Sequence, residues 1–142
     1  MFKRIKEIRS KTGVLHFVRW QLFAIPWTTI KLYLHLIDRA DEDADEHDHP
    51  WSFISLILKG GYVEASQHRI IRRTPGSLAY RPAWESHRVT KLLGRTYSLA
   101  LVWGERRPWG YQTPYGWVEQ AEYRRLKNAV KPTNATVPHP TH

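Results

Sequence analysis

Two stretches decide the fold: residues 47–60 read HDHPWSFISLILKG, and residues 76–87 read GSLAYRPAWESH. The first holds a His-x-His pair and then a segment, Trp51–Leu58, that is apolar at nearly every position. A run of that length, bounded by a proline and two glycines, favours a strand buried on both faces over a helix. We therefore expect a β core with His47 and His49 at its entrance.

Strand-like segments on both sides extend this core. Upstream, residues 29–37 alternate strictly between apolar and polar side chains, which is typical of a half-buried strand. Many short strands at close, regular spacing indicate an antiparallel sandwich or barrel, so we predict an all-β fold. Downstream, turn signals separate the further segments 62–66, 68–73, 77–81, 87–92 and 97–103.

The ends of the chain carry other patterns. Residues 2–11 are basic and place apolar side chains three residues apart, which predicts a short helix. Residues 14–25 are apolar with mixed periodicity, so helix and strand both stay open. The expected organisation has four parts: an N-terminal basic segment packing on the barrel (1–26), the barrel (27–118), a C-terminal helix (119–130) and a disordered tail rich in proline and threonine (131–142).

Charge is distributed unevenly along the chain. The 142 residues include 22 Lys and Arg and 13 Asp and Glu, a formal charge of +9, but seven of the acids lie within residues 38–48. Outside that acidic loop, 21 basic residues face 6 acidic ones, a formal charge of +15. A body this basic attracts phosphates, nucleic acid or acidic ligands.

Composition also excludes several classes of function. The chain has no cysteine, which excludes disulfides, thiol catalysis and cysteine-ligated zinc and suits a reducing compartment. No apolar run reaches the ~18 residues of a transmembrane segment. The basic N-terminus is followed by no apolar core or cleavage site of a signal peptide. We therefore expect a cytoplasmic protein.

Three of the eight histidines form a candidate metal site. Residues i and i+2 of a strand share a face, so His47 and His49 point the same way, while His87 follows Pro82 at the start of a later strand. Neutral imidazole is the commonest metal ligand, and a third histidine would complete one face of a divalent ion. The other interpretation is three loop-edge or hydrogen-bonded core histidines.

The spacing of these residues resembles the two motifs of the cupin superfamily. The resemblance covers about residues 29–103, and further strings, HDHPW and KGGY among them, resemble a group of small single-domain bacterial and phage cupins. The matching positions are His47, His49 and Gly60 in the first motif and Gly76, Pro82 and His87 in the second.

Three positions depart from those motifs. Phe53 (or Ile54) stands where the family has a metal-binding Glu, Trp84 replaces a glycine, and Lys91 replaces an asparagine. A site without the Glu resembles the three-histidine site of thiol dioxygenases. A carboxylate from Asp45 or Glu46 in the acidic loop is the alternative fourth ligand.

The resemblance implies a fold, a cofactor and an activity. The fold is a cupin-type double-stranded β-helix, or jelly-roll barrel, to which our own patterns add short N-terminal and C-terminal helices. The metal ligands are His47, His49 and His87, and the cofactor is a divalent metal ion, Fe(II) first, with Mn, Ni, Co and Zn compatible. Three neutral ligands leave the ion its full charge, which favours an anionic co-ligand or substrate. The activity that we expect is that of a metal-dependent oxygenase acting on a small anionic molecule.

Several further side chains are candidates for substrate contact. Tyr33 and His35 share the polar face of the strand over 29–37, which lines either the barrel or the solvent. Arg81 precedes the second histidine motif, and an arginine fork binds carboxylate or phosphate bidentately. The complete predicted set is Tyr33, His35, Phe53, Arg81, Trp84 and Trp109.

Two other functions and one assembly follow from the same patterns. A cupin that binds a sugar or an anion without chemistry is the first alternative. The second is a basic protein that contacts nucleic acid or a membrane surface through its N-terminal helix. Because residues 51–58 are apolar on both faces, we expect their outer face to be covered, most simply in a homodimer.

Overall fold

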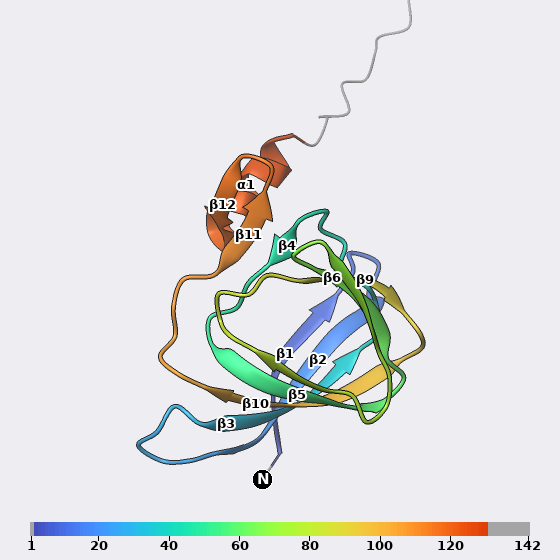
Figure 1. Ribbon diagram of the computed structural model, residues 1–142, viewed down its shortest axis with the longest axis vertical. Coiled ribbons are helices and arrows are strands. Elements are labelled where there is room, and N and C mark those ends of the chain that lie inside the picture. The colour runs from blue at the N-terminus through green and yellow to red at the C-terminus, as the bar shows by residue number, and fades with distance from the viewer. Residues whose placement is uncertain (1, 131–142) are drawn as a thin grey trace, which may run out of the picture.

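A computed structural model describes residues 2–130, which form antiparallel sheets and one helix (Figure 1). The helix, α1 (Gln120–Ala129), confirms the predicted C-terminal helix, and no helix among the described residues is long and apolar enough to cross a membrane. The predicted tail over 131–142 lies outside the described residues. The strands are β1 (Lys3–Arg9), β2 (Leu15–Ala24), β3 (Lys31–Ile37), β4 (Glu46–His47), β5 (Ser52–Lys59), β6 (Tyr62–Ser66), β7 (Arg69–Arg73), β8 (Leu78–Arg81), β9 (Arg88–Leu92), β10 (Thr96–Trp103), β11 (Gly110–Thr113) and β12 (Gly116–Glu119).

The largest sheet has six strands in the order β1-β2-β3-β10-β5-β8. Strand alternation gives it two faces with different side chains. The face that we call inner carries Tyr33, Ala100 and Val102, which are buried in a core cluster against Trp51 and Phe53. The face that we call outer carries a row of paired apolar residues, Trp20, Leu34, Leu99, Leu56 and Leu78, one from each of five neighbouring strands.

Two three-stranded sheets, β12-β11-β4 and β7-β6-β9, complete the barrel. They meet at an antiparallel bridge in which His47 and His87 exchange two backbone hydrogen bonds of 2.9 Å. Apolar side chains from β5, β6 and β9 fill the second core cluster, formed by Ile57, Tyr62 and Val89. The prediction of an all-β barrel is confirmed.

The turn after β5 requires the glycine that the first motif placed at position 60. Gly60 has φ of +81°, and a Cβ there would lie 2.4 Å from the carbonyl oxygen of Arg95. An L side chain rarely adopts that φ and would collide with backbone. The chain can therefore reverse into β6 only with glycine at this position.

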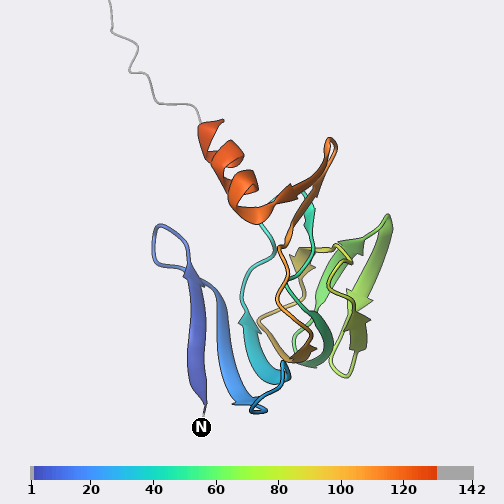
Figure 2. The same cartoon turned by 90° about the vertical axis from the view of Figure 1, so that its left-hand side faces the viewer.

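The C-terminal hairpin and helix lie at one end of the barrel, beside β4 (Figure 2). The structure forms the hairpin β11–β12 over residues 110–119, which the sequence analysis did not predict. Tyr111 pairs with His47 in this sheet, so the hairpin backs the first histidine of the candidate site.

The N-terminal helix prediction is wrong. Lys3–Arg9 forms β1, an exposed edge strand paired antiparallel with β2, and residues 14–25, left open between helix and strand, form β2. The free edge of β2 offers backbone hydrogen bonds that a helix could not satisfy, and this pairing overrides the local spacing of apolar residues. A contact with nucleic acid or membrane through an N-terminal helix is withdrawn with it.

Candidate metal centre

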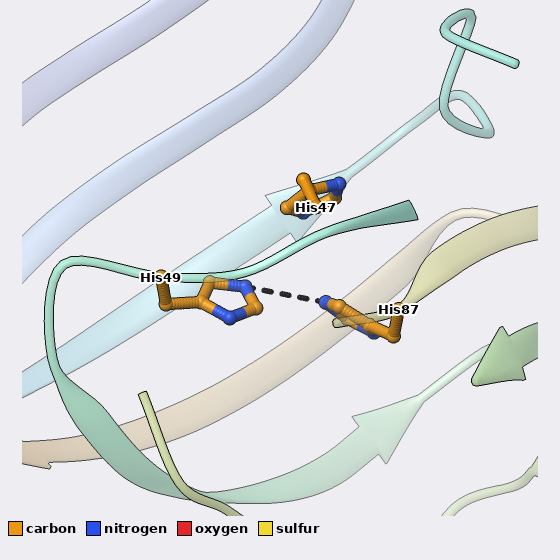
Figure 3. Close-up of side chains that lie close together, drawn as sticks. All are labelled: His47, His49 and His87. Carbon is orange, nitrogen blue, oxygen red and sulfur yellow. Dashed lines mark hydrogen bonds between the residues drawn. The ribbon is translucent and has the colours of Figure 1, made fainter. Parts of the chain in front are cut away.

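The three predicted histidines converge at the junction of the two small sheets. His47 ends β4, His49 follows it, and His87 immediately precedes β9. One ring nitrogen from each lies within 4.8 Å of the other two. Figure 3 shows His49 and His87 pointing at each other, with their Nε2 atoms 3.2 Å apart. The shared backbone bridge between His47 and His87 fixes the spacing of two of the three rings.

A buried carboxylate that sequence reasoning missed orients His87. Glu64, on β6, is 0% exposed, and its Oε2 lies 2.8 Å from Nδ1 of His87. The carboxylate accepts the Nδ1 proton, which leaves the lone pair of His87 on Nε2, toward His49. A carboxylate hydrogen-bonded to a histidine in this way fixes the ring for metal binding.

Two arginines hold Glu64 in turn. Arg81 donates from Nη2 to Oε1 at 2.6 Å, and Arg73 donates from Nε to the same oxygen at 2.9 Å. Burial alone would raise the pKa of Glu64, but the hydrogen bond to His87 and the charge of Arg81 outweigh it and lower the pKa to about 2. The carboxylate is therefore ionised at neutral pH.

The histidines themselves are held in the neutral form. Burial lowers the pKa of His49 well below its usual range, and the nearby His87 and His47 lower it further. Burial is also the main cause that lowers the pKa of His47 and of His87, against the opposing charges of nearby carboxylates. Nδ1 of His49 is buried and has no hydrogen-bond partner in the part of the chain that the structure describes. At pH 7 the site presents neutral imidazoles with available lone pairs.

Two of the predicted substrate-contact residues lie against this triad. The ring of Phe53 packs edge-on against His49, with centroids 4.9 Å apart, so the position of the missing Glu supplies an apolar wall. The ring of Trp109 lies 6.2 Å from that of His47. Both rings place aromatic surface beside the imidazoles.

Two other predicted residues, Tyr33 and His35, lie on the face of β3 that lines the barrel rather than on the face toward solvent. Tyr33 is 3% exposed in the core, and the ring of His35 lies beside it with centroids 6.1 Å apart. Both therefore line the barrel interior. The structure adds Arg19 from β2, whose Nε donates to Nε2 of His35 at 2.9 Å. Arg19 was missed, although it is a charged residue inside the apolar stretch 14–25.

The remaining two predicted residues lie away from a ligand's reach. Arg81 is 3% exposed, and its guanidinium is occupied by Glu64 and by Glu85 at 3.6 Å. Trp84 is 68% exposed, outside the group of rings around the triad. Arg81 therefore acts on the site through Glu64.

The acidic loop supplies structure around the triad. Asp45 accepts a hydrogen bond from the hydroxyl of Tyr123, and Glu46 accepts one from the backbone of Gln67. Neither carboxylate belongs to the cluster of candidate ligand atoms among the described residues.

Asp48, between the two histidines, points the other way and is buried. Its carboxylate accepts from the backbone nitrogen of Gly110 at 2.7 Å and from Nε1 of Trp117 at 3.0 Å, and Arg107 lies 3.4 Å away. Asp48 therefore fastens the histidine segment to the C-terminal hairpin.

Comparison with known proteins found likeness in structure. No family model and no curated protein matches the chain. A cupin 2 conserved barrel domain protein from Rhodopseudomonas palustris superposes with a TM-score of 0.59 at 17% identity, covering 90% of this chain and 86% of that one. A cupin-2 domain protein from Rhodospirillum rubrum gives 0.59 at 19% identity, covering 88% and 81%.

An enzyme is also among the similar structures. A DMSP lyase from Ruegeria pomeroyi superposes with a TM-score of 0.55 at 18% identity, covering 69% of this chain and 52% of that one. At these identities the likeness establishes the fold alone. What the site does follows from its own side chains.

Proposed function

With the cupin fold as the premise, we propose that His47, His49 and His87 bind a divalent metal ion and that this centre acts on a small anionic molecule. The convergence of three neutral ring nitrogens within 4.8 Å of one another carries the proposal. The donor set fits such an ion, because imidazole suits Fe, Ni, Cu and Zn. Among the described residues, Nδ1 of His49 has no hydrogen-bond partner that would compete with coordination.

The other residues of the site have defined roles under this proposal. Glu64 keeps the lone pair of His87 on Nε2, and Arg81 and Arg73 keep Glu64 ionised and in place. Phe53 and Trp109 supply aromatic surface beside the rings of His49 and His47, against which the apolar part of a ligand could pack. A divalent ion held by neutral ligands supplies uncompensated positive charge to an anionic group and open positions for a second ligand.

We propose Fe(II) as the ion and oxygenation as the reaction, with a non-catalytic anion- or sugar-binding role as the alternative. The three-histidine donor set without a carboxylate supports the first. Oxygen consumption with a panel of small carboxylates and phosphates separates the two. Uptake that requires Fe(II) and is lost in His87→Ala supports the oxygenase, whereas binding of a panel member without uptake supports the alternative.

Metal analysis tests the centre itself. Protein purified without a histidine tag should carry about one metal ion per chain, since a site with three fixed ligands survives purification. His87→Ala should retain less than ~0.2 ion per chain. His68→Ala, which removes an exposed histidine from the turn between β6 and β7, is the matched control and should keep the full content. Equal, low metal content in all three proteins would overturn the proposal.

We also propose a homodimer formed through the outer face of the six-stranded sheet. Leu78 and Tyr80 on this face are 67% and 60% exposed, beside the apolar row that ends at Leu78. Among the described elements, the helix α1 packs on β11 and β12 rather than on this face. Exposed apolar side chains that lie together on one face favour contact with another chain. Sedimentation at micromolar concentration should give twice 16.8 kDa, and a 16.8 kDa species would contradict it.

A further inference from the structure

Arg19 presents an unoccupied guanidinium fork inside the barrel. Its Nε is bonded to His35, but within residues 2–130 its terminal nitrogens have no hydrogen-bond partner, and neither is sealed from solvent. The guanidinium carbon lies 4.9 Å from the ring centre of Tyr33 and 5.5 Å from those of Phe17 and Trp51. Three aromatic rings therefore orient a fork whose strongest partners would be two oxygens of one anion.

A second positive charge stands beside it without compensation. Lys6 on β1 is the direct cross-strand partner of Arg19 on β2, and side chains so paired share a face with Cβ atoms about 5 Å apart. Like charges directly opposite destabilise a sheet. No carboxylate in the described part of the chain pairs with either residue, whereas the charges of Arg106 and Arg124 also act on Lys6 and help lower its pKa, after burial and Arg19.

Lys6 and Arg19 continue across β3 to a third paired residue, His35, which contributes no negative charge. His35 is the cross-strand partner of Arg19 on the other side, and it accepts the Nε proton, so its own proton is on Nδ1. Burial, and then the charges of Arg19 and Lys6, lower the pKa of His35 well below its usual range. The row Lys6, Arg19, His35 thus carries two cations and a neutral imidazole.

Aromatic side chains of the inner core cluster lie between this row and the histidine triad. Trp51, which faces Arg19, packs in one cluster with Tyr33 and Phe53, and Phe53 contacts the ring of His49. Both the guanidinium and the triad therefore border the same core cluster. A small molecule lying along it would meet positive charge at one end and the imidazoles at the other.

We propose that Arg19, assisted by Lys6, binds the carboxylate or phosphate group of a small molecule whose remainder extends toward His47, His49 and His87. The proposal rests on the proposed function only for that second part. Anion binding at Arg19 itself requires no metal. Arg19 is thus the residue that selects for a negative group, a role that sequence reasoning gave to Arg81.

Titration of metal-free protein with inorganic phosphate and, separately, with acetate tests this site. The readout is the Nε–H signal of Arg19 in a nitrogen–proton correlation spectrum, assigned by its loss in Arg19→Lys, together with the Tm. We expect saturable shifts with at least one anion and a rise in Tm. Arg19→Gln should weaken that binding at least tenfold, and Arg19→Lys, which keeps the charge but loses the fork, should weaken it less. The stronger of the two probes distinguishes a phosphate from a carboxylate site.

Controls separate this site from general surface charge and from the metal centre. Arg72→Gln removes an exposed charge from β7 and should leave the anion affinity unchanged. Lys6→Gln should raise the Tm without anion by about 1–3 °C, because repulsion is relieved, and yet weaken anion binding. Equal binding by the wild type and Arg19→Gln, or no saturable response to either anion, would overturn the proposal. Metal content should be the same in Arg19→Gln and the wild type, so failure of one site is distinguishable from failure of the other.

Discussion

Two groups of charged side chains, one around Glu64 and one around Arg19, are balanced in opposite ways. Around Glu64, one carboxylate is shared by Arg81, Arg73 and His87, so every charge has a partner. Around Arg19, the neighbouring charge is the like-charged Lys6, and within residues 2–130 its only hydrogen-bond partner is the neutral imidazole of His35. A charge that is paired within the chain stabilises the fold, whereas an unpaired cation is available to bind an anionic ligand.

Glu64→Gln tests the balanced group and should have the largest effect. Removing the carboxylate charge leaves the buried Arg81 with only its longer contact to Glu85, at 3.6 Å, which should lower the free energy of unfolding by about 3–5 kcal/mol. Urea denaturation of metal-free protein measures the change. Glu122→Gln, which breaks an exposed contact with Arg125 on α1, should leave the midpoint where it is.

A second substitution checks that prediction. If Arg81 is the stranded charge, then Glu64→Gln combined with Arg81→Met should recover part of the loss. A loss of under about 1 kcal/mol in the single variant would show that the carboxylate adds little, against the expected cost of an unpaired buried charge.

Asp48→Asn should have the next largest effect. An amide in place of the carboxylate loses the charge near Arg107 and cannot accept equally well from both Gly110 and Trp117. The expected loss is about 1.5–3 kcal/mol, measured by urea denaturation. Asp38→Asn, which breaks a more exposed pair with Arg95, should shift the midpoint far less. Equal shifts in the two variants would contradict the buried role of Asp48.

The group around Arg19 should make the free energy of unfolding depend on pH through His35. The pKa of His35 is lowered in the folded protein, mainly by burial, so this imidazole stays neutral when the unfolded chain, with an ordinary pKa near 6.5, takes up a proton. Its contribution to stability is full above about pH 6.5 and is lost as the pH falls toward the lowered pKa. His35→Gln should reduce the protons taken up on unfolding near pH 5.5 by about one, as measured by the pH slope of the unfolding free energy. An unchanged slope would mean that His35 is protonated in the folded protein.

Arg19→Gln should have the smallest effect on stability of the four. The substitution removes favourable contacts with aromatic rings but also relieves the repulsion by Lys6, and no ion pair is lost among the described residues. We expect the free energy of unfolding to change by less than about 1 kcal/mol in anion-free buffer. A loss comparable to that of Glu64→Gln would contradict the distinction between the two groups.

The sequence was sufficient for the strands of the barrel and for the His47–His49 pair because both depend on local spacing, whereas His87 was placed by the resemblance to the second cupin motif. His47 and His49 two residues apart, and apolar alternation over 29–37, map directly onto strand geometry. The N-terminal segment was mispredicted because its structure depends on an edge of β2 that local pattern cannot show. The hairpin β11–β12 was missed for a similar reason: Gly110 is required by the carbonyl of Val118, 2.0 Å from where a Cβ would lie, a contact made only in the fold.

In the sequence, Glu64 and Arg19 stand out only as charged residues at positions where the pattern predicts a buried side chain. Glu64 alternates with Tyr62 and Ser66, both buried, so its parity placed an acid inside the barrel. Arg19 similarly interrupts an apolar stretch. Neither signal names a partner, because the residues that surround these two side chains come from strands distant in sequence.

Anomalous scattering from a crystal, recorded across the Fe, Mn, Co, Ni and Zn absorption edges, tests the central claim most directly. A single peak should lie within about 2.0–2.3 Å of one ring nitrogen from each of His47, His49 and His87, with Glu64 bonded to His87 rather than to the metal. The edge at which the peak appears names the ion, and we predict iron. A crystal of protein purified without chelator that shows no peak between these histidines, or a peak bound by Glu64 instead, would contradict the account.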